Sequence, residues 1–168
     1  MYIKKNAGFT LIELMVVISI IGVLSAIVLA SMTAARNKGA NAAVKADLNG
    51  VIKQAEIYFY AHSNAYGTAA PSNTDCGVAA NQVGVFADTN ISAALVAAKS
   101  AEGGTALYCT MPATGTAYAV AVPLKGGGYW CVDSTGIARS ATAGGTAYTG
   151  TNGASPAAVT NATTYKCN

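Results

Sequence analysis

The stretch Gly8-Phe9-Thr10-Leu11-Ile12-Glu13, with the apolar run that follows it to Ala35, decides how this chain is organised. Residues 14–35 carry no charged side chain. About 20 apolar residues are enough for a helix to cross the hydrocarbon core of a bilayer. The short leader ahead of this run carries Lys4 and Lys5, which by the positive-inside rule hold the N-terminus in the cytoplasm. The sequence therefore predicts a single membrane-spanning helix near the N-terminus.

Glu13 is the unusual residue of this segment. A carboxylate near the centre of a bilayer costs roughly 2.5 to 3.5 kcal/mol and normally has a partner. A secretory signal peptide has a shorter apolar core, followed by a cleavage site with small residues. Here the one processing-like site, between Gly8 and Phe9, comes before the apolar run instead. The alternative is a plain membrane anchor in which the glutamate is incidental.

The pattern K-K-x-x-G-F-T-L-I-E-L, from Lys4 to Leu14, resembles the processing and methylation signature of type IV prepilins and of the related pseudopilins of type II secretion. The resemblance implies that a prepilin peptidase and methyltransferase cuts between Gly8 and Phe9 and methylates the new Phe9 amine. It also implies that Glu13 of one subunit pairs with the Phe9 amine of a neighbour, because a buried charge is costly unless it is paired. The implied partners are identical or related subunits in a helical homopolymer, and an assembly platform in the membrane.

The same resemblance implies an α+β, pilin-like fold, in which a long N-terminal α-helix packs on a small antiparallel β-sheet domain with disulfides. It divides the chain into a leader at 1–8, a transmembrane and filament-core half of the helix at 9–35, an amphipathic half at 36–62 and a globular domain at 63–168. The precursor is then a single-pass protein of the cytoplasmic (inner) membrane, with its C-terminal domain outside. After assembly the subunit lies in a filament on the cell surface.

Apolar residues at helical spacing predict that the helix continues past the membrane to about Ala61. They are Val44, Leu48, Val51, Ala55 and Phe59. Gly67 and Pro71 then act as helix breakers. No proline interrupts the helix, whereas many type IV pilins carry one in this stretch, and in this respect the chain is more like the pseudopilins.

The rest of the chain predicts short elements. A loop runs through Cys76, after which Asp88 to Asn90 provide N-caps for a short helix that Gly103 and Gly104 end. Residues 118–124 and 129–133 predict two strands, joined in a hairpin by the glycine-rich loop at 125–128, and residues 137–139 predict a short third strand. The Ala, Gly, Thr and Ser-rich tail to Tyr165 has no usable periodicity.

All four cysteines, Cys76, Cys109, Cys131 and Cys167, lie beyond the membrane run. An even number in an exported domain predicts two disulfides. A zinc site is the weaker alternative, because structural zinc sites take ligands in closely spaced pairs. Four cysteines allow three pairings, and chain order favours Cys76 with Cys109 and Cys131 with Cys167.

The sequence predicts a structural protein rather than an enzyme. The single histidine, His62, falls at the predicted end of the helix. This position favours the interpretation that His62 is solvated over a catalytic role. We expect no cofactor and no metal, because the acidic residues beyond the helix are too dispersed to predict a calcium site. The sequence has no Lys/Arg-rich patch of the kind that indicates a nucleic-acid site. Only 10% of the residues are charged, which is low for the surface of a soluble monomer. A surface that is buried against identical neighbours explains this composition.

Three functions follow from these features. The first is a subunit of an extracellular type IV pilus-like filament. The second is a pseudopilin of a type II secretion system. The third, of another class, is a monomeric membrane-anchored binding module or enzyme.

Overall fold

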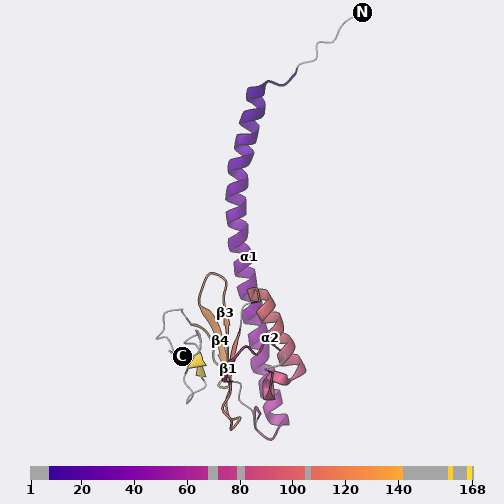
Figure 1. The fold of residues 1–168 in the computed structure, drawn as a ribbon, viewed down its shortest axis with the longest axis vertical. Coiled ribbons are helices and arrows are strands. Elements are labelled where there is room, and N and C mark those ends of the chain that lie inside the picture. The colour runs from indigo at the N-terminus through magenta and orange to yellow at the C-terminus, as the bar shows by residue number, and fades with distance from the viewer. Residues whose placement is uncertain are drawn as a thin grey trace, which may run out of the picture. The chain divides into compact units, whose positions relative to one another are not determined.

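The computed structural model describes residues 8–67, 72–78, 82–104, 107–141, 159–160 and 166–167. The chain divides into two compact units, the first ending at Arg36 and the second beginning at Asn37. The fold is α+β, with a long N-terminal helix and a small antiparallel sheet (Figure 1). This confirms the predicted fold class.

Helix α1 (Leu11–Ala61) begins in the first unit and continues into the second. By its length and composition it is able to cross a bilayer, and it is the one such helix among the residues described. From Phe9 to Met32 its large apolar side chains are exposed on every side of the helix. The described residues leave this surface uncovered, and an exposed apolar surface of this extent is typical of a site that contacts lipid or other protein chains.

The second half of α1 forms one wall of the hydrophobic core of the second unit. Of the predicted apolar face, Val44, Leu48, Val51 and Ala55 are buried, and Phe59 is half-buried against the same core. This confirms the predicted face. These residues pack against buried side chains of the sheet and of the short helix α2 (Thr89–Glu102). The 3.6-residue period of an α-helix places these residues on one side, so this half is amphipathic where the first half is not.

The sheet has five antiparallel strands in the order β1-β2-β3-β4-β5, so neighbours in sequence are neighbours in space. The strands are β1 (Ser72–Thr74), β2 (Tyr108–Thr110), β3 (Ala119–Pro123), β4 (Tyr129–Asp133) and β5 (Ala138–Ala141). A separate two-stranded sheet pairs β6 (Val159–Thr160) with β7 (Lys166–Cys167).

The predicted hairpin is confirmed as β3 and β4, which pair from Ala119↔Asp133 to Pro123↔Tyr129. The loop between them needs its glycines, because Gly126, Gly127 and Gly128 all have positive φ. This loop is fastened to α1 by Asn41. The Asn41 amide donates to the Lys125 carbonyl at 3.0 Å and accepts from the Lys125 N–H at 2.8 Å.

Three strands differ from the predictions. β1 lies in the segment that was predicted as a loop, and β2 lies in a segment for which the sequence predicts no element. Each has three residues, too few to show the alternation of apolar and polar side chains that identifies a strand. β5 begins one residue later than predicted and extends to Ala141. Of the tail to Tyr165, the structure describes β6 alone, and the rest of that prediction lies outside the described residues.

Helix α2 begins and ends where its caps predict. A 3-10 helix, η2 (Gly84–Ala87), precedes it. The Asp88 carboxylate accepts from the N–H groups of Asn90 at 3.0 Å and Ile91 at 3.1 Å. Gly103 follows the helix in the left-handed conformation, with φ 114°. Both ends therefore have the hydrogen-bond partners that a helix terminus needs.

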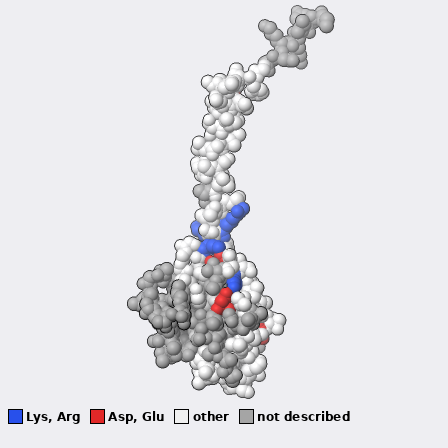
Figure 2. Space-filling model, in the orientation of Figure 1, with Lys and Arg blue, Asp and Glu red and all other residues white. Residues whose placement is uncertain are grey.

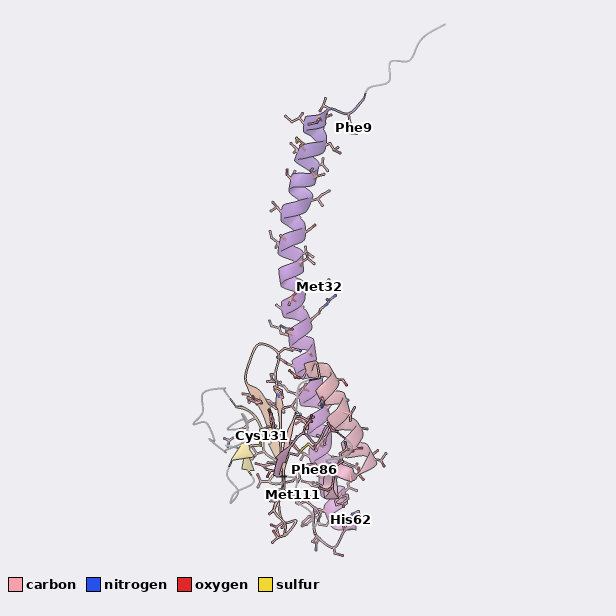
Figure 3. The ribbon with its side chains drawn as sticks, viewed as in Figure 1. Phe9, Met32, His62, Phe86, Met111 and Cys131 are labelled. Atoms are coloured by element: carbon pink, nitrogen blue, oxygen red, sulfur yellow. A yellow bond between two sulfur atoms is a disulfide. The ribbon has the colours of Figure 1, made fainter. Side chains whose placement is uncertain are left out.

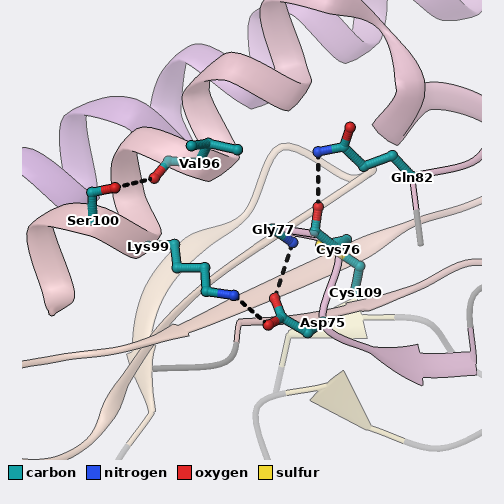
Figure 4. Close-up of polar contacts among 8 residues, drawn as sticks. All are labelled: Asp75, Cys76, Gly77, Gln82, Val96, Lys99, Ser100 and Cys109. Carbon is teal, nitrogen blue, oxygen red and sulfur yellow. Dashed lines mark hydrogen bonds and ion pairs between the residues drawn. A yellow bond between two sulfur atoms is a disulfide. The ribbon is translucent and has the colours of Figure 1, made fainter. Parts of the chain in front are cut away.

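The segment between α1 and α2 is fastened to its surroundings by side chains rather than by long strands (Figure 4). Asp75 accepts from Lys99 of α2 at 2.5 Å and from the N–H of Gly77 at 3.0 Å. The next residue, Cys76, forms a disulfide with Cys109 of β2. A covalent bond and an ion pair at adjacent positions thus hold this segment against both the helix and the sheet.

The two faces of α1 in the second unit give a direct test of the core. Leu48 is 0% exposed and Ile57 is 61% exposed, on the same helix. Leu48→Ala should lower the free energy of unfolding by about 2 to 5 kcal/mol, because it leaves a cavity in a packed core. The matched change Ile57→Ala should stay within about 0.5 kcal/mol of wild type.

The measurement is denaturant unfolding of the full chain in detergent, with the fluorescence of Trp130 as the signal. This is the single tryptophan, and its ring lies 4.6 Å from the Lys45 amine on α1. Equal effects of the two substitutions would contradict the assignment of the buried face.

Candidate functional site

The peptide bond between Gly8 and Phe9 lies just ahead of α1, which begins at Leu11. Both residues are exposed, and Phe9 is 93% exposed (Figure 3). A Cβ placed on Gly8 would meet nothing within 4 Å among the described residues. This backbone is therefore non-helical and uncovered, which is the condition in which a peptidase can bind an extended segment.

Glu13 lies in the first turn of α1, and Thr10 holds its carboxylate. Oε2 of Glu13 accepts from both the N–H and the hydroxyl of Thr10, each at 2.8 Å. In return, the N–H of Glu13 donates to the Thr10 hydroxyl at 3.3 Å. Thr10 and Glu13 thus form a capping box, the reciprocal pairing of an N-cap hydroxyl and an acidic side chain three residues later. Sequence reasoning missed Thr10, although the T-x-x-E spacing is the signal that identifies it.

Glu13 faces the same side of the helix as several apolar residues. Together with Phe9, Ile12, Val16 and Val17 it lines a shallow hollow on α1. It is the one charged side chain between Gly8 and Ala35, and the early part of α1 shows no Lys or Arg in Figure 2. Among the described residues Glu13 forms no ion pair.

The two disulfides lie in the second unit. Cys76 pairs with Cys109 and Cys131 pairs with Cys167, the pairing that chain order favours, with Cα–Cα distances of 5.8 Å in each case. The first bond joins the segment after α1 to β2, and the second joins β4 to the C-terminal strand β7. The two bonds therefore link short elements that are far apart in the sequence.

The other titratable groups that the structure describes lie in separate surroundings. His62 is exposed at the end of α1, with Nδ1 2.9 Å from the Tyr58 carbonyl and its ring stacked on that of Tyr58. The part of the chain that the structure describes has no group of three or more His, Cys, Asp or Glu side chains able to hold a metal. Burial raises the pKa of the Tyr66 and Tyr118 phenols, whose rings pack edge to face at 4.9 Å. These phenols stay neutral at physiological pH and act in packing.

Comparisons with known proteins agree with the features at the start of α1. Residues 3–29 match the family model described as the prokaryotic N-terminal methylation motif. The chain is 34% identical over 116 residues to the type IV wide pilus major component PilA4 of Thermus thermophilus, an alignment that covers 66% of this chain and 86% of that protein. No solved structure matches the chain. With the methylation motif, the long apolar helix and this relative, the chain belongs to the type IV pilin family.

Proposed function

We propose that this chain is a structural subunit of an extracellular type IV pilus-like filament. The precursor is stored as a single-pass protein of the inner membrane, with its C-terminal domain outside. A prepilin peptidase cuts between Gly8 and Phe9 and methylates the new amine, and an assembly platform adds the subunit to a helical homopolymer. The observation that carries this proposal is the exposed apolar part of α1 with the single carboxylate of Glu13 in its first turn.

The apolar side chains from Phe9 to Met32 require two successive environments in this proposal. While the subunit is stored, lipid tails cover them. In the filament the same helices of neighbouring copies cover them, so the apolar surface never faces water. A monomeric membrane anchor needs the first environment alone, and it has no use for a carboxylate or for removal of eight residues.

Glu13 gives the assembled helices a defined position relative to one another. One of its carboxylate oxygens, Oε2, is engaged by Thr10 of the same chain, and this contact is between neutral donors and a charged acceptor. The charge itself still needs a cation in apolar surroundings. Cleavage after Gly8 creates such a cation at Phe9, and methylation keeps it positive. Pairing of Glu13 with the Phe9 amine of a neighbour would satisfy both buried charges.

A pilus rather than a secretion pseudopilus is favoured by the relative that is the major component of a type IV wide pilus. A pseudopilin of a type II secretion system is the second candidate. The observation that favours it is the uninterrupted α1, which contains no proline over its 51 residues. Recovery of the subunit in filaments sheared from the cell surface would support the pilus, and loss of protein secretion on deletion would support the pseudopilin.

Processing at Gly8 is tested by Gly8→Val. We expect this change to leave the uncut precursor in the membrane, because a branched side chain next to the scissile bond obstructs the active site of the peptidase. The matched control is Gly22→Val, since Gly22 is also an exposed glycine of the first unit with nothing within 4 Å of an added Cβ. Intact mass and the N-terminal residue report the outcome. Normal mature chain from Gly8→Val would rule out this cleavage site.

The role of Glu13 is tested by Glu13→Ala and Glu13→Gln. Both variants should be inserted and cleaved yet build few or no filaments, because loss of one member of a buried pair costs roughly 3 to 5 kcal/mol. Filaments sheared from cells are counted and compared with the amount of mature subunit in the membrane. Native disulfides in the variants would show that the second unit still folds.

Thr10→Val is the matched control for Glu13. It removes the hydroxyl that donates to Glu13 but keeps the carboxylate, whereas Glu13→Ala removes the carboxylate and the capping box together. Thr10→Val should therefore retain more filaments than Glu13→Ala. Filaments of wild-type number from Glu13→Ala would show that the carboxylate has no part in assembly, and equal losses from both variants would assign the defect to the helix cap.

A further inference from the structure

Asp133, at the end of β4, is a fully buried carboxylate whose two oxygens have different partners. It is 0% exposed. Oδ1 accepts from the N–H of Thr135 at 2.8 Å and from its hydroxyl at 2.5 Å, within the turn that follows β4. Oδ2 accepts from the N–H of Cys167 at 2.8 Å, 34 residues away in the sequence. One oxygen therefore serves the local turn, and the other serves the C-terminal strand.

Cys167 is held at three of its atoms. Its sulfur is bonded to Cys131, its N–H donates to Asp133, and its carbonyl accepts from the guanidinium of Arg139. Cys131 and Asp133 are two residues apart in β4, so they lie on the same face of the sheet. Arg139 of β5 is the direct cross-strand neighbour of Cys131. These three residues form one patch, on the face of the sheet opposite the core that α1 lines.

The polar contacts to Cys167 do not depend on the sulfur–sulfur bond. A buried carboxylate oxygen without a donor carries a large desolvation penalty, so Asp133 favours the conformation in which the Cys167 N–H is in place. The Arg139 guanidinium favours the same conformation through the Cys167 carbonyl. With both cysteines reduced, these contacts would hold the Cys167 thiol beside the Cys131 thiol. The disulfide closes a separation of 36 residues, and the contacts of Asp133 and Arg139 to Cys167 close separations of 34 and 28 residues within it. Each contact therefore lowers the loop entropy that the others must overcome.

We propose that Asp133 and Arg139 form a polar clamp that positions Cys167 for oxidation and thereby directs its pairing with Cys131. In the oxidation, the two thiols lose two protons and two electrons as the sulfur–sulfur bond forms. An external disulfide, such as oxidised glutathione or the disulfide of an oxidoreductase, takes up those electrons and protons and becomes two thiols. Without the clamp, the C-terminal cysteine reaches any of the other three cysteines of the chain. This proposal does not depend on filament assembly.

Three variants separate the clamp from the turn. Asp133→Asn keeps one acceptor oxygen for the turn but places an amide NH₂ opposite the Cys167 N–H, so donor faces donor. Thr135→Val is the matched control, because it removes the hydroxyl bond to Oδ1 and leaves Oδ2 and Cys167 untouched. Arg139→Met removes the contact to the Cys167 carbonyl while keeping a long apolar side chain.

The experiment equilibrates the full mature chain in detergent with defined mixtures of reduced and oxidised glutathione. After acid quenching, peptide mapping without reduction gives the fraction of each disulfide and of mispaired forms. We expect the equilibrium constant for Cys131–Cys167 to fall roughly tenfold or more in Asp133→Asn, from the loss of one charge-assisted hydrogen bond. Arg139→Met should also lower it, Thr135→Val should stay within about twofold of wild type, and mispaired Cys131 should appear in Asp133→Asn.

The Cys76–Cys109 disulfide is the internal reference in the same molecules. Its constant is taken as the ratio of this disulfide to the reduced Cys76 and Cys109 pair. This ratio should not change, because mispaired forms are counted separately and lower both of its members in proportion. An unchanged Cys131–Cys167 constant in Asp133→Asn would overturn the proposal. So would an equal fall in Asp133→Asn and Thr135→Val, because the turn rather than the clamp would then be responsible. A parallel fall at Cys76–Cys109 would assign the effect to loss of the whole second unit, and it would overturn a local role as well.

Discussion

The physical constraint on which this protein depends is the apolar surface of the first part of α1, together with the carboxylate that lies on it. The large apolar side chains from Phe9 to Met32 are exposed in the part of the chain that the structure describes. Hydrophobic surface of this extent is stable in a lipid bilayer or between other apolar helices, and in water it drives association. Glu13 adds a second requirement to the first, since its charge needs a cation in whichever apolar environment covers the helix. The capping box with Thr10 satisfies one oxygen without supplying that cation.

The two halves of α1 meet opposite requirements with one continuous helix. The first half is apolar on all sides and depends on other molecules, whereas the second half buries one face against its own chain. The second half is also fastened by polar contacts, through Asn41 to the β3–β4 loop and through Lys45 to the ring of Trp130. This arrangement lets the second unit hold its fold whether the first half of the helix lies in lipid or against neighbouring copies.

Disulfides and charged side-chain contacts stabilise the second unit, whose strands are short. β1 and β2 have three residues each, and β6 and β7 have two. Such strands contribute few ladder hydrogen bonds. Beside these short strands, a disulfide lies next to a charged contact: Cys76–Cys109 beside Asp75 and Lys99, and Cys131–Cys167 beside Asp133 and Arg139. The repeated pairing of a covalent bond with a charged contact is the basis for the clamp proposed at Cys167.

The sequence by itself determined the elements whose signals are local. The apolar run, the position of Glu13, the buried face of α1, both ends of α2 and the β3–β4 hairpin all follow from patterns within a few residues, and such patterns act before any distant contact forms. Only the tertiary structure decided where β1 and β2 pair, and that Asn41 holds Lys125 at a separation of 84 residues. The same is true of Asp133, which the sequence places at the end of a predicted strand and which the fold buries against Cys167. A contact of this kind depends on the register of every element between its two partners, so no local pattern contains it.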